Sequence, residues 1–325
     1  MKRIFPYFWI IIILITSCTP VAQSAGLDGV VSPELQQTTI SIEGSNPVVT
    51  NSLPVDNRPT VAIATATATP TESPTPQATA TADNRLAPEK WQEWPVTPDI
   101  TSRVFEIYTL GQQLGNDLHS FTKIGDCHSI QEAFMGLFDH PGWYKLVNGR
   151  EHLQASIDWF NGSFDRDGYA VKGGYNAAAV LSPIWADPQT CLPGENPVQC
   201  EVRVHKPTFA FISLEVWWDG RTAEHYEAYM RTIIEYLMEH GVVPILATKA
   251  DNIEGDHSLN LTTAKLAYEY NLPLWNFWRA VQVLPNRGMD AERNDGFHIS
   301  YEAWTTRSFT ALESLDNLWG KVNGR

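Results

Sequence analysis

The sequence predicts a single α/β domain in which a mainly parallel sheet lies between two layers of helices. Two near-continuous apolar runs, residues 207–216 and 242–248, have the composition of buried parallel strands. Between them, residues 222–241 place apolar side chains three and four positions apart, as an amphipathic helix does. Strands that alternate with helices in this way are typical of a three-layer α/β/α architecture.

The chain divides into three parts, at residues 1–18, 19–88 and 89–325. The middle part contains residues 60–83, which consist largely of threonine, alanine and proline. Such a segment cannot bury enough apolar surface to become ordered. We therefore expect residues 19–88 to form a disordered tether in front of a folded domain.

A signal peptide is predicted at the start of the chain. Met1-Lys2-Arg3 precedes an apolar run at residues 4–15 that is too short to span a membrane. The run ends in Ile15-Thr16-Ser17-Cys18, which resembles a bacterial lipobox and predicts lipidation of Cys18. An ordinary secretory signal with an incidental cysteine is the alternative. On the first interpretation the protein is exported and anchored to the outer face of the cell membrane.

The folded domain is expected to begin with a helix at residues 103–114 that ends near Gly115-Asn116. Pro207 suits the first position of a strand, and Gly241 suits the end of a helix. The remaining predicted strands comprise residues 121–124 and 272–277, and the remaining helices residues 130–137, 153–160, 177–181, 259–270 and 303–319.

The 325 residues carry a formal net charge of −14, and their hydrophobic content of 43% suits one core. No run rich in lysine and arginine is present, so we do not expect a nucleic-acid partner. We expect a monomer without a cofactor, which contacts the membrane only through its N-terminal lipid.

The four cysteines suit an exported protein. Cys191 and Cys200 flank a loop rich in proline and glycine, and a short disulfide between them is plausible in an oxidising compartment. With Cys18 assigned to the lipid, Cys127 remains. A remaining cysteine is either buried and inert or a reactive thiol.

The position of Cys127 favours the reactive interpretation. Gly125-Asp126-Cys127 directly follows the strand at residues 121–124 and precedes the predicted helix. The first N–H groups of a helix stabilise an anion at this edge of an α/β sheet, which would lower the pKa of the thiol. Far downstream, Asp295 and His298 have the spacing of a carboxylate that orients an imidazole base.

Gly125-Asp126-Cys127 and Asp295-Gly296-Phe297-His298 resemble two sequence blocks of the SGNH (GDSL-type) hydrolase family. In that family the first block reads Gly-Asp-Ser, and the last block supplies the Asp and His of a catalytic triad. The resemblance extends from about Trp91 to the end of the chain. It implies a flavodoxin-like fold and a triad of Cys127, His298 and Asp295, with cysteine in place of serine.

The family's second and third blocks supply its oxyanion hole. Gly174 matches the second block, so its N–H and that of Cys127 would hold the oxyanion; the alternative is that Gly173-Gly174 only permits a tight turn. The third block, Gly-x-Asn-Asp, is absent, because Ser213-Leu214-Glu215 stands in its place. Loss of one such donor typically lowers the rate by about 10²–10³-fold. Asn176 is the candidate for the missing amide.

The resemblance implies an esterase or acyl transferase that acts on an acylated carbohydrate or lipid. Glu215, Trp217 and Trp218 are the candidate substrate-binding residues, and Trp275 and Trp278 also suit sugar stacking, although a tryptophan is more often part of a core.

Two alternatives to the esterase interpretation involve a different chemistry. The first is an inactive surface lipoprotein that binds carbohydrate or another ligand in the old cleft, which would explain why the serine and the third-block asparagine are both missing. The second is a zinc site formed by Cys127, His128, Asp295 and His298. No Cys-x-x-Cys or His-x-x-x-His spacing supports that site, so we predict no metal.

Overall fold

The computed structural model describes residues 85–216, 222–293 and 295–325. Its sheet has four parallel strands in the order β1-β2-β3-β4. The strands are β1 (Asp117–Gly125), β2 (Pro207–Ser213), β3 (Val243–Ala247) and β4 (Leu274–Trp275). The predicted α/β fold with a parallel sheet is confirmed. Cys18, the predicted signal peptide and the predicted tether up to residue 84 lie outside the described residues.

A short segment extends the sheet beyond β1. The N–H of Gly125 donates to the carbonyl of Ala170 (3.0 Å), and the N–H of Lys172 donates to the carbonyl of Gly125 (3.3 Å). With residues 170–172 counted, the order across the sheet is that of a flavodoxin-like fold, in which the chain leaves β1 toward one side and returns on the other. Ligands of such sheets bind at the carboxyl end of this first strand.

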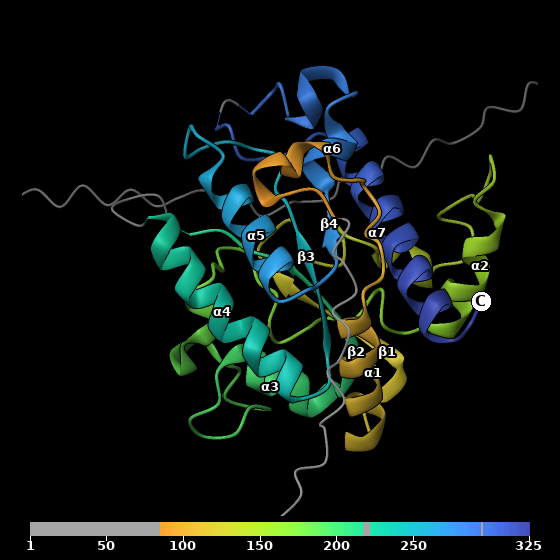
Figure 1. The fold of residues 1–325 in the computed structure, drawn as a ribbon, viewed down its shortest axis with the longest axis vertical. Coiled ribbons are helices and arrows are strands. Elements are labelled where there is room, and N and C mark those ends of the chain that lie inside the picture. Colours follow the sequence, from red (N-terminus) through yellow and green to blue (C-terminus); the bar gives the residue numbers. More distant parts are fainter. Residues whose placement is uncertain (1–84, 217–221, 294) are drawn as a thin grey trace, which may run out of the picture. The chain divides into compact units, whose positions relative to one another are not determined.

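Helices cover both faces of the sheet (Figure 1). Helices α4 and α5 pack together against β3, while α7 packs against β4 and contacts α1 and α2. The α-helices are α1 (Ser102–Leu114), α2 (Gln154–Trp159), α3 (Pro197–His205), α4 (Ala223–Glu239), α5 (Ser258–Glu269), α6 (Phe277–Val281) and α7 (Tyr301–Val322). Among the described residues, no helix combines the length and apolar character needed to cross a membrane.

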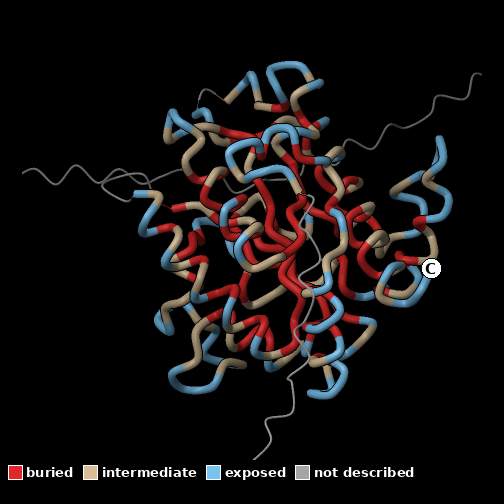
Figure 2. Tube along the Cα trace, viewed as in Figure 1, coloured by how far each residue is buried: buried red, intermediate tan, exposed pale blue. Residues whose placement is uncertain are grey.

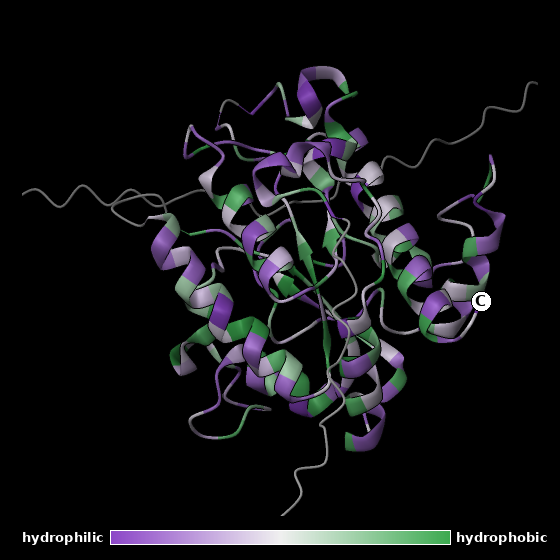
Figure 3. Cartoon of the chain, viewed as in Figure 1, coloured by the Kyte–Doolittle hydropathy of each residue, from purple (hydrophilic) through white to green (hydrophobic). Residues whose placement is uncertain are grey.

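The core follows the central strands. Figure 2 shows that the buried part of the chain is concentrated on the sheet, and Figure 3 shows hydrophobic residues along the central strands. Phe209, Phe211, Ile245 and Leu246 are each at most 1% exposed, because side chains on both faces of β2 and β3 are covered by helices. Trp275 is fully buried among them, so it belongs to the core.

The predicted helix at residues 130–137 is wrong. Turns follow β1 up to Met135, and the first helical residues are those of the 3₁₀-helix η2 (Gly136–Asp139). The Asp126 side chain accepts the N–H of His128 (2.8 Å), and Arg307 donates to the His128 carbonyl. These bonds hold the turn that precedes the segment. Within the segment, Met135 has a φ of +66°, and its N–H donates to the Ser308 hydroxyl (3.1 Å) instead of to the Gln131 carbonyl, so a regular helix does not form. The predicted helix at residues 177–181 is likewise reduced to a 3₁₀-helix, η4 (Ala179–Leu181).

Helix α3 was not predicted, although its start has clear signals. Pro197 stands at its first position, and the side chains of Asn196 and Gln199 each accept the other's backbone N–H. The helix carries Cys200, which forms a disulfide with Cys191, as predicted.

Candidate active site

Cys127 lies in a tight turn at the carboxyl end of β1. The turn is closed by a hydrogen bond from the N–H of Ser129 to the carbonyl of Asp126 (2.9 Å). Gly125 precedes it where a side chain has no room, because an added Cβ would lie 2.1 Å from the Ser129 hydroxyl and 2.9 Å from the Ser213 carbonyl. The thiol is half-buried, so a small reagent can reach it.

Asp295 and His298 form a closely bonded pair in the loop before α7. One carboxylate oxygen of Asp295 accepts the N–H groups of Phe297 and His298 (3.0 Å each), and the other lies 2.6 Å from Nδ1 of His298. Partial burial raises the pKa of Asp295, but the hydrogen bonds from His298 and Phe297 outweigh it and lower the pKa to about 2. Asp295 is therefore ionised and fixes the imidazole through Nδ1, which leaves Nε2 available.

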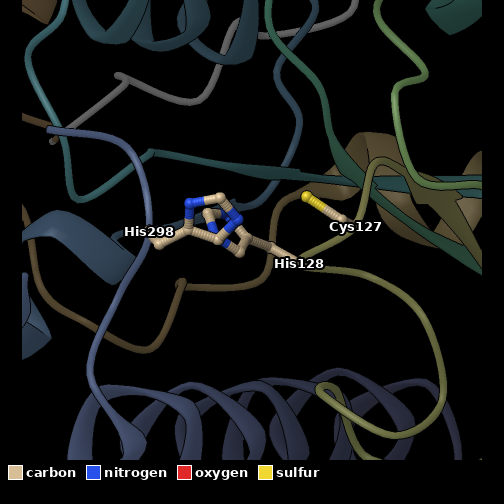
Figure 4. A group of neighbouring side chains, drawn as sticks. All are labelled: Cys127, His128 and His298. Carbon is tan, nitrogen blue, oxygen red and sulfur yellow. The ribbon is translucent and has the colours of Figure 1, made fainter. Parts of the chain in front are cut away.

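The fold brings the two blocks together across about 170 residues of sequence (Figure 4). The sulfur of Cys127 and one ring nitrogen each of His128 and His298 all lie within 4.8 Å of one another. His298 is 8% exposed, and its loop is held by a hydrogen bond from the N–H of Asp290 to the His298 carbonyl (2.9 Å). The geometry thus places an oriented imidazole beside a thiol.

His128 lies next to both groups. Its ring stacks on Phe297 with centroids 4.5 Å apart and meets the edge of the His298 ring at 5.5 Å. Burial and, after it, the positive charge of Arg307 hold the pKa of His128 well below its usual value. Among the described residues, its buried Nε2 has no hydrogen-bond partner. His128 is therefore a neutral imidazole with an unused nitrogen.

Arg307 of α7 holds the turn around Cys127 in place. The sequence did not predict a role for it. Its buried guanidinium donates to the His128 carbonyl and to the hydroxyls of Ser213 (2.9 Å) and Ser129 (3.4 Å). Burial lowers its pKa to about 10, against the opposing effect of Asp126 and Cys127. A signal was present, since Arg307 interrupts the stripe of buried apolar residues formed by Ala303, Ala311, Leu315 and Leu318.

Asp126 gives the site a pH-dependent stability. Burial raises the pKa of Asp126 to about 6, although the N–H of His128 and the charge of Arg307 act in the opposite direction. Because this pKa exceeds the ordinary 3.8, protonated Asp126 makes its full contribution to the free energy of unfolding below about pH 4. The free energy of unfolding falls by about 3 kcal/mol as the pH rises through 6 and Asp126 ionises.

The Asp126→Asn variant should lack that part of the pH dependence. Asparagine retains the oxygen that accepts from His128 but stays neutral, so at pH 7 we expect the variant to be up to about 3 kcal/mol more stable than the native protein. Urea unfolding between pH 4 and 7.5 measures the difference. Asp99→Asn, at an exposed position, serves as the control. A constant difference across this pH range would contradict the assignment.

Gly174 and Asn176, the candidates for the oxyanion hole, follow the segment paired with β1. The N–H of Tyr175 donates to the Lys172 carbonyl (3.0 Å), which closes a turn in which Gly174 has a φ of +86°. A glycine is therefore required there for the turn, whatever its N–H contributes to chemistry. The side-chain oxygen of Asn176 accepts the N–H groups of Ala178 and Ala179, which leaves only its amide nitrogen for an oxyanion.

Glu215 stands where the family's third block has asparagine. Its carbonyl accepts the N–H of Ala177 (2.8 Å), so the segments matching the second and third blocks are joined. Its side chain turns to Lys249, whose ammonium lies 3.2 Å from Glu215 and 2.6 Å from both Asp251 and Glu254. Burial and the neighbouring Asp251 hold the pKa of Glu215 well above its ordinary value, despite Lys249. Trp217 and Trp218 lie outside the described residues.

Two hollows adjoin these groups. A cavity of about 20 Å³, room for one water, lies between Lys249, Glu215 and Arg307. A more open hollow of about 580 Å³ is lined by Trp278, Met289 and Gly296, among other residues, and borders the loop that carries His298. The second hollow is large enough for a small substrate.

No family model matches the sequence, and no curated protein matches it. Among solved structures, the chain is similar to a GDSL-like lipase from Bacteroides thetaiotaomicron, with 14% identity and a TM-score of 0.41 over 66% of this chain and 98% of that one. It is also similar to a protein of the G-D-S-L family from Desulfitobacterium hafniense (14% identity, TM-score 0.39, 60% of this chain and 99% of that one). A third similar structure is an acetyl xylan esterase (14% identity, TM-score 0.38, 60% of this chain and 97% of that one).

Proposed function

We propose that this protein is an ester hydrolase of the SGNH type that uses Cys127 as its nucleophile. The observation that carries the proposal is the position of the Asp295–His298 pair beside the Cys127 thiol at the carboxyl end of β1. A carboxylate, an imidazole and a nucleophile in this order form the arrangement that activates serine and cysteine hydrolases.

In the proposed reaction, Nε2 of His298 takes the proton of the thiol as the sulfur attacks the ester carbonyl. The C–S bond forms, and the carbonyl electrons move to the oxygen, where the N–H groups of Cys127 and Gly174 stabilise the charge. The imidazolium then protonates the departing alkoxide. Water, deprotonated by the same imidazole, releases the acid and restores the thiol. Asp295 stabilises the imidazolium in both steps.

The first test measures the nucleophile without a substrate. Cys18→Ser is introduced into the full chain, so that Cys127 is the one thiol outside the disulfide. The alkylation rate of Cys127 is then measured against pH, with and without His298→Ala. We expect a thiol pKa below the usual ~8.5, rising when His298 is removed. A thiol pKa that is unchanged by His298→Ala would exclude the triad. It would favour a protein that only binds a ligand in this cleft.

The proposed substrate class rests on the larger hollow, which is lined by Gly296 of the loop that carries His298. Trp278 is half-buried on its wall, and its ring packs against Trp91 with centroids 4.9 Å apart. A partly exposed indole on the wall of a cleft suits the apolar face of a sugar. We therefore propose an acylated carbohydrate as the substrate and an acylated lipid as the second choice, to be separated by a screen of acetylated sugars and aryl esters.

We also propose that the protein is exported and anchored through lipidated Cys18. The charged start, the apolar run and the lipobox-like sequence support this, and the Cys191–Cys200 disulfide suits an oxidising compartment. Metabolic labelling with a fatty-acid analogue tests the anchor, because Cys18→Ala should abolish the label.

A further inference from the structure

We propose that Cys127, His128 and His298 together form a binding site for a thiophilic divalent cation, Zn²⁺ in particular. The bound ion would inhibit the enzyme by occupying its catalytic groups. The sequence analysis had predicted no metal, because the spacing of these residues matches no familiar zinc motif. The inhibitory consequence rests on the proposed function, whereas the binding itself does not.

The donor set is the first reason. One thiolate and two imidazoles form a ligand combination that zinc accepts, with a fourth position left for water or another ligand. The three donor atoms lie within 4.8 Å of one another. Ligand atoms of a tetrahedral zinc site are roughly 3.3–3.6 Å apart, so side-chain movements of about 1 Å bring the three donors onto one ion. In Figure 4 the sulfur of Cys127 points toward the side on which the rings of His128 and His298 lie.

The second reason is that both histidines are prepared to be ligands. Asp295 binds Nδ1 of His298 at 2.6 Å, which fixes the ring and leaves Nε2 as the electron-pair donor. A carboxylate behind a ligating histidine is the usual outer partner of a zinc site. His128 is half-buried, and its buried Nε2 has no hydrogen-bond partner among the described residues. A metal ion would supply one.

The third reason is the separation of roles. The proposed hydrolysis requires Cys127, His298 and Asp295 but gives His128 no part, although this histidine is held in place by Phe297 and by the Arg307 bond to its carbonyl. In a metal site, His128 would serve as a ligand. When Zn²⁺ displaces the thiol proton and binds the thiolate, neither the sulfur nor the imidazole of His298 remains available for an ester.

The test uses the full Cys18→Ser chain without a histidine tag, dialysed against ZnCl₂ and assayed for bound metal. We expect one zinc per chain and at least tenfold slower alkylation of Cys127 in the presence of Zn²⁺. MgCl₂ should give no protection, since magnesium prefers oxygen ligands. Cys127→Ala should abolish binding. Asp295→Asn should weaken it by about 10–100-fold, the usual effect of removing an outer partner.

His128→Phe is the decisive variant, because phenylalanine keeps the stacking on Phe297 and removes the ligand. We expect it to lose at least as much zinc affinity as Asp295→Asn does. The matched control is His152→Phe, since the His152 side chain is 58% exposed and lies outside the cluster. Near-UV circular dichroism of each variant establishes that it is folded.

Zinc binding that is equal in the His128→Phe and His152→Phe variants, or that survives Cys127→Ala, would overturn the proposal. The absence of any bound zinc would do the same. None of these results bears on ester turnover, which is measured separately in zinc-free buffer. A protein that binds zinc and hydrolyses no ester would contradict the proposed function alone.

Discussion

The Cys127→Ala variant is expected to lose ester turnover by about 10⁴-fold or more. Removal of the nucleophile leaves only the binding energy and the oxyanion donors, and in comparable triads the loss reaches about 10⁶-fold. His298→Ala should cost about as much. The double variant should be no worse than either single variant, because nucleophile and base act as one unit. Initial rates with an activated aryl ester measure all three.

The Cys127→Ser variant separates cysteine chemistry from that of the usual serine enzymes. A serine hydroxyl ionises far less readily than a thiol, so it depends more on the oxyanion donors. Here Glu215 occupies the place of one donor, and its side chain is committed to Lys249. We therefore expect the serine variant to lose about 10²-fold or more. Full activity of this variant would contradict the expected dependence on the oxyanion donors. More than a tenth of native turnover in Cys127→Ala would show that Cys127 is not the nucleophile.

The largest loss of stability is expected from Lys249→Met. The Lys249 ammonium is in contact with three carboxylates, and its side chain is only 10% exposed. Removing it leaves buried negative charges without a counterion, which costs about 3–5 kcal/mol for one broken pair. Denaturant unfolding at pH 7 measures the loss. Lys265→Met, at an exposed position of α5, is the control and should change stability by less than about 0.5 kcal/mol.

Two further measurements connect this loss to charge rather than to packing. A second substitution, Glu254→Gln, removes one of the stranded carboxylates and should restore part of the stability. Lowering the pH should also reduce the deficit, because Glu215, whose pKa is raised by burial, becomes neutral by taking up a proton. If the deficit is the same at pH 4.5 and pH 7, the cluster is not held together by charge.

The layers of the fold could be predicted because the signals were long and redundant. The apolar runs that became β2 and β3 and the helical stripe of α4 are each determined by many side chains that agree. The turn after Cys127 is different. The apolar residues that follow it have helical spacing, yet Met135 has a left-handed backbone and its N–H bonds to the Ser308 hydroxyl. Such a contact over 173 residues leaves no trace in a local pattern.

The pairing of Asp295 and His298 was visible in the sequence because the two residues are only three positions apart. The surroundings of Glu215 were not. The sequence had indicated Glu215 only as a lost oxyanion donor and a candidate substrate-binding residue, whereas the structure places the ammonium of Lys249, from the end of the next strand, beside it. The burial of Arg307 was also not predicted. Although Arg307 interrupts an apolar stripe, a charged residue in a long helix is normally solvated.

The lack of space at Gly125 also provides a criterion for finding relatives of this protein. Any larger residue there would displace Ser129 and the turn that presents the thiol. A related sequence with the same site should therefore have glycine at this position, whether cysteine or serine follows two residues later, and a long cation in the final helix. Positions 125, 127 and 307 define that pattern, and of these only the nucleophile at 127 belongs to the triad.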